Sequence, residues 1–312
     1  MSAPATLAME TPARAVLGRF MRHRLALFSA GVLVLLATLS LLAPVFETLL
    51  GVDGEAVDLF SRYGPATAEH PLGTDELGRD VLIRLLYGGQ VSLFVGLTAT
   101  FAAAVIGTAI GLMAGYAGGR IDAFVMRVTD GVIALPVLPL LIVLAAVDLN
   151  KLGLPETLLS SESISLYRIV AIVALVGWTT VARLVRASTL SVKTRPFVLA
   201  ARAQGAGAGR IMLRHILPNL ASPIIVATTL SVGNVILLES VLSFLGLGIQ
   251  PPLPSWGNLL TGAQETIWEA PGLAFYPGLL IFVTVIAFNF VGDGLQDALD
   301  PRARDRRAAD RH

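Results

Sequence analysis

The sequence predicts an all-α polytopic membrane protein with six transmembrane helices, and its composition and hydropathy carry this prediction. Apolar residues make up 54% of the 312 residues and charged residues only 14%, whereas soluble domains carry about 25% charge. The mean hydropathy is +0.74, and six runs approach the roughly 20 apolar residues that cross a bilayer. This composition argues against a soluble enzyme, a disordered chain and a nucleic-acid-binding protein. The chain has no cysteine, so we expect neither disulfides nor thiolate metal sites.

The first and fourth of these six spans need separate justification. The first, residues 25–46, is long for a signal peptide and precedes no small-x-small cleavage site, so we expect a retained anchor. The fourth has 14 residues between Arg168 and Arg183 and reaches full length if both arginines snorkel. The remaining spans are expected at residues 91–117, 124–148, 216–238 and 270–292.

Basic residues are distributed unevenly around these spans, and this bias predicts the orientation of the chain. With the N-terminus in the cytoplasm, 18 of the 23 lysines and arginines lie inside and five outside. The opposite orientation would invert this ratio, against the positive-inside rule. We therefore expect both termini, residues 1–24 and 301–312, in the cytoplasm. The five outer basic residues are Arg62, Arg79, Arg84, Lys151 and Arg168.

Two connections are too long to be turns. The outer one, residues 47–89, holds eight acids and three arginines. The inner one, residues 186–218, favours a helix that Gly205 can end in a left-handed conformation. A second short helix is expected over residues 208–217, before Pro218. The result is a helix–turn–helix elbow at the cytoplasmic surface.

The elbow carries small residues that allow another chain to approach its backbone closely. Ala200, Ala201, Ala203 and Gly205 provide these positions. Composition alone leaves open a second interpretation, in which the elbow is a basic interfacial helix that rests on anionic membrane lipid.

Four sequence blocks resemble a family of transporters over residues 19–302. AARAQG, at residues 200–205, and HILPN ten residues later resemble the EAA motif of binding-protein-dependent ABC importer permeases. One departure is Leu199, which stands where the motif has glutamate, so docking would rely on shape and on small residues. Three further blocks resemble the dipeptide/oligopeptide/nickel branch and its "C" subunit: HPLGTDELGRDVLIRLLYGGQVSL (70–93), ESVLSFLGLGIQPPLPSWGNLL (239–260) and DGLQDALDPR (293–302).

The resemblance implies the type I, or MetI-like, ABC importer permease fold over residues 90–300, in the bacterial inner membrane. Such a permease pairs with a second homologous permease, forms a pathway for peptides or related solutes, and receives substrate from an external binding protein. Two cytoplasmic ATPase subunits would bind ATP and Mg²⁺ and dock on the elbow as a coupling helix. The implied docking residues are Phe197, Leu199, Ala200, Ala201, Arg202, Ala203, Gly205, His215 and Pro218.

The chain itself supports part of this division of labour. A phosphate-binding P-loop needs GxxxxGK[ST], but the two lysines, Lys151 and Lys193, follow Asn150 and Val192. We therefore expect neither an enzyme nor a bound cofactor. His70 and His215 have no second ligand at metal-binding spacing, so no metal site is expected either.

Candidate pathway or gate residues are Glu239, Asn234, Pro136 and Asn289. Glu239 is the acid closest to the middle of an apolar stretch, where charge costs about 2.5–3.5 kcal/mol. It could bind the amino group of a peptide in the pathway, or it could cap a neighbouring loop. We favour the loop-capping role. For Asn234 and Asn289 a structural hydrogen bond is favoured. Pro136 interrupts the third span, and broken helices often line transport pathways.

Two further features concern packing. Ala103, Gly107, Gly111 and Gly115 recur at four-residue spacing, which suits close helix contact in lipid. We favour packing within the subunit over contact with a partner permease. The prolines of residues 251–257 exclude a regular span there and predict a rigid outer loop.

Two other classes of function compete with an ABC permease. A self-contained secondary transporter or channel would show related halves and ionisable groups near the bilayer midplane, and the sequence has no clear internal repeat. An intramembrane aspartyl protease would need a GxGD motif, and the nearest string, VGDG at residues 291–294, has the wrong order.

Overall fold

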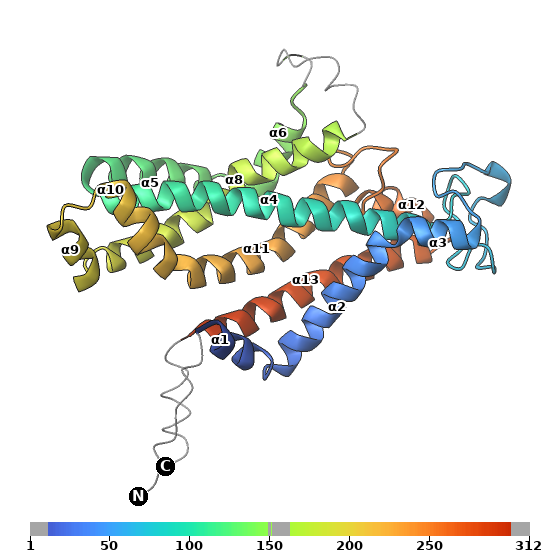
Figure 1. Ribbon diagram of the computed structural model, residues 1–312. Coiled ribbons are helices and arrows are strands. Elements are labelled where there is room, and N and C mark those ends of the chain that lie inside the picture. The colour runs from blue at the N-terminus through green and yellow to red at the C-terminus, as the bar shows by residue number, and fades with distance from the viewer. Residues whose placement is uncertain (1–11, 149–150, 152–162, 301–312) are drawn as a thin grey trace, which may run out of the picture.

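A computed structural model describes the chain outside four segments: residues 1–11, 149–150, 152–162 and 301–312. Long helices run along one common direction, with the elbow at one end and the outer segment at the other (Figure 1). The helices are α1 (Pro12–Phe20), α2 (Arg24–Leu41), α3 (Ala43–Leu50), α4 (Val81–Ala117), α5 (Gly119–Ala134), α6 (Val137–Ala145), α8 (Ile164–Val192), α9 (Pro196–Ala203), α10 (Ala208–Arg210), α11 (Leu217–Phe244), α12 (Ala263–Thr266) and α13 (Gly272–Leu299).

Five helices in the described residues are long and apolar enough to cross a membrane, and α5 and α6 form a sixth, broken candidate. This agrees with the expected number of spans, although several boundaries differ. α8 extends well beyond the expected fourth span at its C-terminal end. The single helices are α2, α4, α8, the continuous segment Ala208–Phe244 and α13.

The contact between α4 and α8 is the most extensive in the fold, and glycines make it possible. A Cβ on Gly107 would lie 2.5 Å from the carbonyl oxygen of Trp178, and one on Gly115 would lie 2.7 Å from Cβ of Thr189. Gly111 faces the backbone of Ala182 just as closely. The small-residue seam therefore packs within the subunit, as predicted.

The first span is shorter than expected. α2 ends at Leu41, and a separate helix α3 begins at Ala43, so the prediction of one helix over residues 25–46 was wrong. Pro44 occupies the first turn of α3. Because proline has no amide hydrogen and clashes with the preceding turn, it starts a new helix readily but does not continue an old one.

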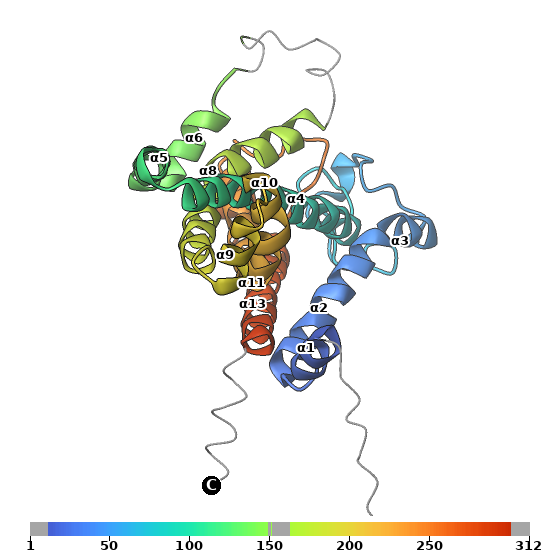
Figure 2. The ribbon, with the colours of Figure 1, turned by 60° about the vertical axis from the view of Figure 1, so that its left-hand side comes forward.

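The third predicted span is also wrong as a single helix. α5 and α6 meet at a bend of 88°. The break lies at Leu135, which is extended because the following Pro136 disfavours helical geometry there. Pro139 falls in the first turn of α6 and adds no kink. α5 lies along the elbow half of the bundle, whereas α6 turns away from it (Figures 1 and 2).

The second helix of the elbow does not stop before Pro218, contrary to our expectation. α10 continues through a π-helical turn (Ile211–Ile216) into α11, so that one helix covers Ala208–Phe244. Pro218 sits in the first turn of α11. The wider π turn relieves the clash between a proline ring and the carbonyl of the preceding turn. The second helix of the elbow and the fifth span are therefore one continuous element.

The outer segment is ordered by two aspartates of the string HPLGTDELGRD. Asp75 accepts hydrogen bonds from the backbone nitrogens of Leu77 (2.8 Å) and Arg79 (3.0 Å) through one oxygen. Asp80 caps α4 by accepting from the nitrogen of Ile83 at 2.8 Å. Its other oxygen lies 3.0 Å from Nδ1 of His70, so this histidine has a structural contact.

A substitution at Gly111 tests the seam. We expect Gly111→Ala to destabilise the protein by about 1–3 kcal/mol, because the new methyl group overpacks the α4–α8 contact. Thermal unfolding of the purified protein in detergent measures the effect. Gly131→Ala on α5 is the control, because nothing lies within 4 Å of the added Cβ, and its stability should hold or rise slightly. Equal melting temperatures for the two variants would contradict the close packing.

Candidate functional site

The elbow is built by α9 and its terminal glycine. Pro196 occupies the first turn of α9, where its missing amide hydrogen costs nothing. Gly205 has φ of +81°, which confirms the predicted left-handed end. The nitrogen of Ala206 donates to the carbonyl of Ala201 at 3.0 Å, and that of Gly205 to Arg202 at 3.0 Å. These two bonds satisfy carbonyls that the end of the helix leaves open.

α9 has one buried face and one exposed face. Val198 and Ala201 are buried, and Val198 belongs to a core cluster that it shares with α4, α8, the π-helical turn and the start of α11. Phe197 and Leu199 are 44% and 50% exposed, although both are large and apolar. Surface patches of this kind mark interaction sites. The exposed face also holds the smaller predicted residues Ala200, Ala203 and Gly205.

Three other predicted elbow residues have different surroundings. The guanidinium of Arg202 lies 5.5 Å from the ring centre of Tyr116, a contact that joins α9 to α4. His215 lies in the π-helical turn, and its carbonyl accepts from Nδ2 of Asn219 at 2.7 Å. Pro218 is exposed one turn further along. The structure therefore brings the predicted docking residues to one end of the bundle but divides them between α9 and the start of α11.

Two ion pairs and a hydrogen bond hold α8 and its C-terminal cap to α5 and α4 near the elbow, and our sequence analysis did not pair these residues. Arg186 forms two hydrogen bonds with the carboxylate of Asp122 on α5, at 2.5 and 2.7 Å. Arg183 pairs with Asp130, also on α5. Lys193 donates to the carbonyl of Gly115 at 2.7 Å. Both aspartates lie more than 50 residues before their partners, and only the packing of α5 beside α8 brings them together.

At the outer end, Glu239 is completely buried on α11 and is surrounded by hydroxyl groups. Ser243 donates to one carboxylate oxygen at 2.7 Å, and Ser92 on α4 donates to the other at 3.2 Å. Ser240 lies 3.5 Å from the same oxygen as Ser92. Buried carboxylates need such partners, since an unsatisfied buried polar group costs about 1–3 kcal/mol.

Ser243 and Ser92 also hold the loop that follows α11. The nitrogen of Ile249 donates to Oγ of Ser243 at 3.0 Å, and the nitrogen of Trp256 donates to Oγ of Ser92 at 3.1 Å. The indole nitrogen of Trp256 donates to the carbonyl of Leu85 at 2.9 Å. Glu239 thus anchors the loop through two hydroxyl groups. This is the geometry of the loop-capping alternative, and a gate role for Glu239 stays a prediction.

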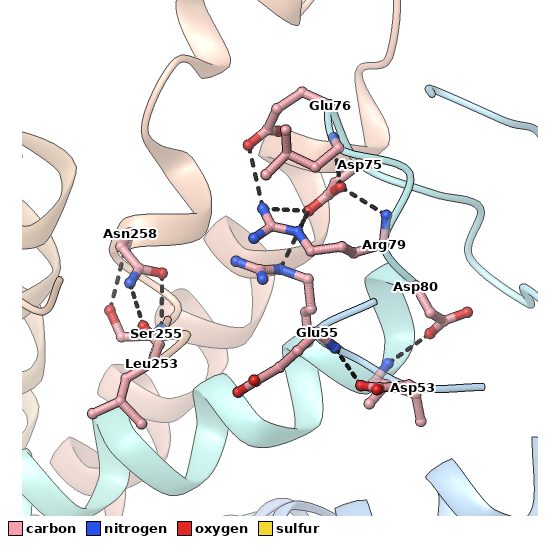
Figure 3. Close-up of polar contacts among 12 residues, drawn as sticks. Asp53, Glu55, Asp75, Glu76, Arg79, Asp80, Leu253, Ser255 and Asn258 are labelled. Atoms are coloured by element: carbon pink, nitrogen blue, oxygen red, sulfur yellow. Dashed lines mark hydrogen bonds and ion pairs between the residues drawn. The ribbon is translucent and has the colours of Figure 1, made fainter. Parts of the chain in front are cut away.

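The loop, residues 245–258, forms no regular span, as the prolines predict, and its rigidity stays a prediction. Asn258 closes it by donating to the carbonyl of Leu253 at 2.8 Å and accepting from the nitrogen of Ser255 at 2.8 Å (Figure 3). From α8, Ser165 accepts from the nitrogen of Gln250, and Arg168 donates to the carbonyl of Leu247. α4, α8 and α11 therefore all hold one outer loop.

The four pathway candidates are not brought together as one site. Pro136 is exposed at the bend before α6, and Asn289 is exposed on α13. Asn289 donates to the carbonyl of Val285 at 2.9 Å, which confirms the favoured structural hydrogen bond. Asn234 is exposed on α11, and none of the described hydrogen bonds involves its amide. The structural hydrogen bond favoured for Asn234 is therefore not found among the described residues, and a pathway role for it stays a prediction.

A bundle of membrane-length helices with an exposed apolar face on the elbow at one end defines a class, the multi-span helical membrane proteins. The chain belongs to the family described as binding-protein-dependent transport system inner membrane components, which matches residues 107–305. Residues 11–50 match the N-terminal transmembrane domain of oligopeptide transport permease C.

Relatives resemble the chain over nearly its whole length. It is 38% identical to the dipeptide transport system permease protein DppC of Alkalihalophilus pseudofirmus, over 94% of this chain and 91% of the relative. It is 35% identical to the oligopeptide transport system permease protein OppC of Bacillus subtilis, over 92% of this chain and 88% of the relative. It is 39% identical to the glutathione transport system permease protein GsiD of Pectobacterium atrosepticum, over 95% of this chain and 93% of the relative.

These comparisons confirm the predicted family, the C-type resemblance and the all-α permease fold. The chain is a multi-span permease of an inner-membrane, binding-protein-dependent importer, and such systems work with ATPases and a substrate-binding protein. This membership favours the ABC importer over a self-contained secondary transporter or channel. It also places the chain among transport permeases rather than intramembrane proteases.

Removing the Ser243 hydroxyl tests the anchoring of the outer loop. Ser243→Ala leaves a carboxylate oxygen of Glu239 and the nitrogen of Ile249 without partners, so we expect a loss of about 1–3 kcal/mol. Hydrogen exchange in residues 245–258 should accelerate. Ser231→Ala is the control, because that hydroxyl donates only within α11, to Ala227.

Unchanged hydrogen exchange of residues 245–258 in the Ser243→Ala variant would contradict this anchoring role.

A Glu239→Gln variant separates the two possible roles of Glu239, loop anchoring and gating. Lost solute uptake with normal loop exchange and normal surface expression would support the gate instead.

Proposed function

We propose that this chain and a second, homologous permease form the translocation pathway of an ATP-driven importer for dipeptides or oligopeptides. The substrate class is supported by the names of relatives that match more than nine-tenths of the chain, among them a dipeptide and an oligopeptide permease. The glutathione permease fits the same class, because glutathione is itself a small peptide. An external binding protein would deliver the solute and carry most of the selection.

The observation that carries this proposal is the exposed face of α9 at one end of the bundle. Phe197 and Leu199 project there beside alanines and Gly205, so an apolar groove of a partner can approach the backbone. We assign this face to one of two cytoplasmic ATPase subunits that bind ATP and Mg²⁺. Because Leu199 replaces the glutamate of the EAA motif, this docking depends on apolar contact and shape. Anionic membrane lipid is the alternative occupant.

The proposed orientation places both chain ends and the elbow in the cytoplasm. α1 packs on the end of α13, and Arg19 donates to the carbonyl of Asp300 at 3.1 Å. His23 lies 3.7 Å from a carboxylate oxygen of Asp297. Together with the charge bias of the sequence, these contacts support a cytoplasmic side for both ends.

Coupling would follow from the continuity of the helix Ala208–Phe244, whose 37 residues span about 55 Å at 1.5 Å per residue. Closure of the ATPase subunits would push α9, and α9 would in turn move the helix Ala208–Phe244 as a rigid unit. The outer end of this helix carries Glu239 and leads into the anchored loop. Asn234 is exposed and lies between the elbow and Glu239. A displacement at the elbow would therefore reach the outer loop through one element.

The proposal is tested by purifying the chain from its native membrane and by measuring uptake. A second permease and two P-loop ATPases should co-purify, and vesicles that hold the complex, supplied with ATP and the external protein, should accumulate labelled alanyl-alanine. A chain that purifies alone and transports without ATP would overturn the proposal. Binding of dipeptides and of glutathione to the external protein would then identify the solute.

A charge at Gly205 tests the docking face. We expect Gly205→Glu to reduce coupled uptake at least tenfold, because a carboxylate would stand where close apolar approach is proposed and would strain a left-handed backbone. ATPase activity and uptake are measured in the same vesicles, and ATP hydrolysis should no longer follow transport.

Two controls separate charge from strain. Gly205→Ala adds the strain without the charge. Gly207→Glu adds the charge at a nearby exposed position with φ of −67°. Normal coupled uptake in Gly205→Glu would remove the docking assignment.

A further inference from the structure

Two cavities open at the outer end of the bundle, and both are lined by Arg84. One, of about 300 Å³, lies between the HPLGTDELGRD segment, α11 and the loop after it. The other, of about 410 Å³, lies between residues 47–55, the start of α4 and the prolines of the loop. Arg84 is the residue that lines both, seven residues before the uncharged run that begins at Val91.

Arg84 is nine-tenths buried but shares its counter-ion with another arginine. Its Nε lies 3.3 Å from an oxygen of Asp75 and makes no hydrogen bond there. The same oxygen is 2.8 Å from both Nε and NH2 of Arg79, and the other oxygen accepts two backbone bonds (Figure 3). Both carboxylate oxygens of Asp75 are therefore already engaged by Arg79 and by the backbone of the same turn. Two guanidinium groups face one saturated carboxylate, so Arg84 can accept a further anion.

The larger cavity is lined by acids as well as by Arg84. Glu47, Asp53 and Glu55 line it together with Arg84. Glu47 is occupied by the hydroxyl of Tyr87 and the nitrogen of Gly54, at 2.6 and 2.8 Å. Asp53 accepts the nitrogen of Glu55 through one oxygen. The exposed carboxylate of Glu55 takes part in none of the described hydrogen bonds or ion pairs. A cation and an anion that no described hydrogen bond or ion pair joins thus border one cavity.

We propose that this cavity binds the two charged termini of a short peptide, with the carboxylate on Arg84 and the ammonium group on Glu55. The proposal rests on the proposed function, which supplies a peptide on this side of the membrane. Guanidinium groups suit planar carboxylates, and a buried cation with a shared counter-ion gains most from a new one. The cavity volume is ample for a dipeptide, so the permease itself contributes to recognition of free termini.

One other zwitterion could fill the cavity, because a phosphatidylethanolamine headgroup also pairs a phosphate with an ammonium group. The acids on the rim would disfavour anionic lipids but not this one. The experiment therefore uses the purified importer in phosphatidylcholine nanodiscs, without the external binding protein. A second preparation contains phosphatidylethanolamine.

The test compares three probes: alanyl-alanine, its C-terminal amide and its N-acetyl derivative. We expect alanyl-alanine to bind at least tenfold more tightly than either derivative. Arg84→Gln should weaken alanyl-alanine binding at least tenfold and leave the amide unchanged, since the amide has no carboxylate to lose. Glu55→Gln, at an exposed position that tolerates substitution, should abolish only the preference for a free amino group.

Arg79→Gln is the matched control, because Arg79 pairs with the same Asp75 but does not line the larger cavity. It should keep the wild-type order of the three probes. A structural role for Arg84 would instead weaken all three probes equally in Arg84→Gln. That result would overturn the proposal, as would equal wild-type affinities or loss of peptide binding in phosphatidylethanolamine nanodiscs.

Uptake assays keep this proposal separate from the proposed function. Uptake of alanyl-alanine with the external protein present, but with no binding in the cavity, would overturn the cavity assignment alone. Absence of uptake under any condition would overturn the peptide importer as well.

Discussion

The close contact between α4 and α8 is the constraint on which the rest of the structure depends. Backbone lies against backbone at Gly107 and Gly111, so the two helices keep one register over their length. At one end that register sets Lys193 against the carbonyl of Gly115. At the other it sets Ser92 and Ser165 around the same outer loop. A helix pair without this register could not hold both ends at once.

Much of the architecture was predictable because lipid imposes simple requirements. Long uncharged runs had to be helices, the asymmetry of basic residues predicted an orientation, and the glycine spacing predicted a packing seam. The elbow was predictable through α9 because Gly205 marks its end. Prolines were harder to interpret. Pro44 and Pro136 end helices, whereas Pro218 is absorbed by a π-helical turn that no local pattern announced.

The polar networks were not predictable, because their members are distant in the sequence. Glu239 could be recognised as unusual, but Ser92 lies 147 residues before it, and only folding shows that both hold one loop. Asp75 likewise looked like one acid among eight. Its saturation by Arg79 and its own turn leaves Arg84 short of a partner, and this depends on distances that residue types do not reveal. The sequence alone thus identifies which residues are costly to bury. It does not identify the hydrogen-bond or ion-pair partners that offset this cost.

The continuous helix Ala208–Phe244 has a consequence for how this protein can evolve. The two faces of the membrane are joined by a stiff rod, so no chain of matched side chains is needed in between. Residues in the lipid-facing middle can then drift as long as they remain apolar. Constraint concentrates at the two ends of the helix, where we propose that a partner docks on one side and where a loop is held on the other. Under the proposed function, substitutions that alter the choice of solute need not disturb the face that docks the ATPase.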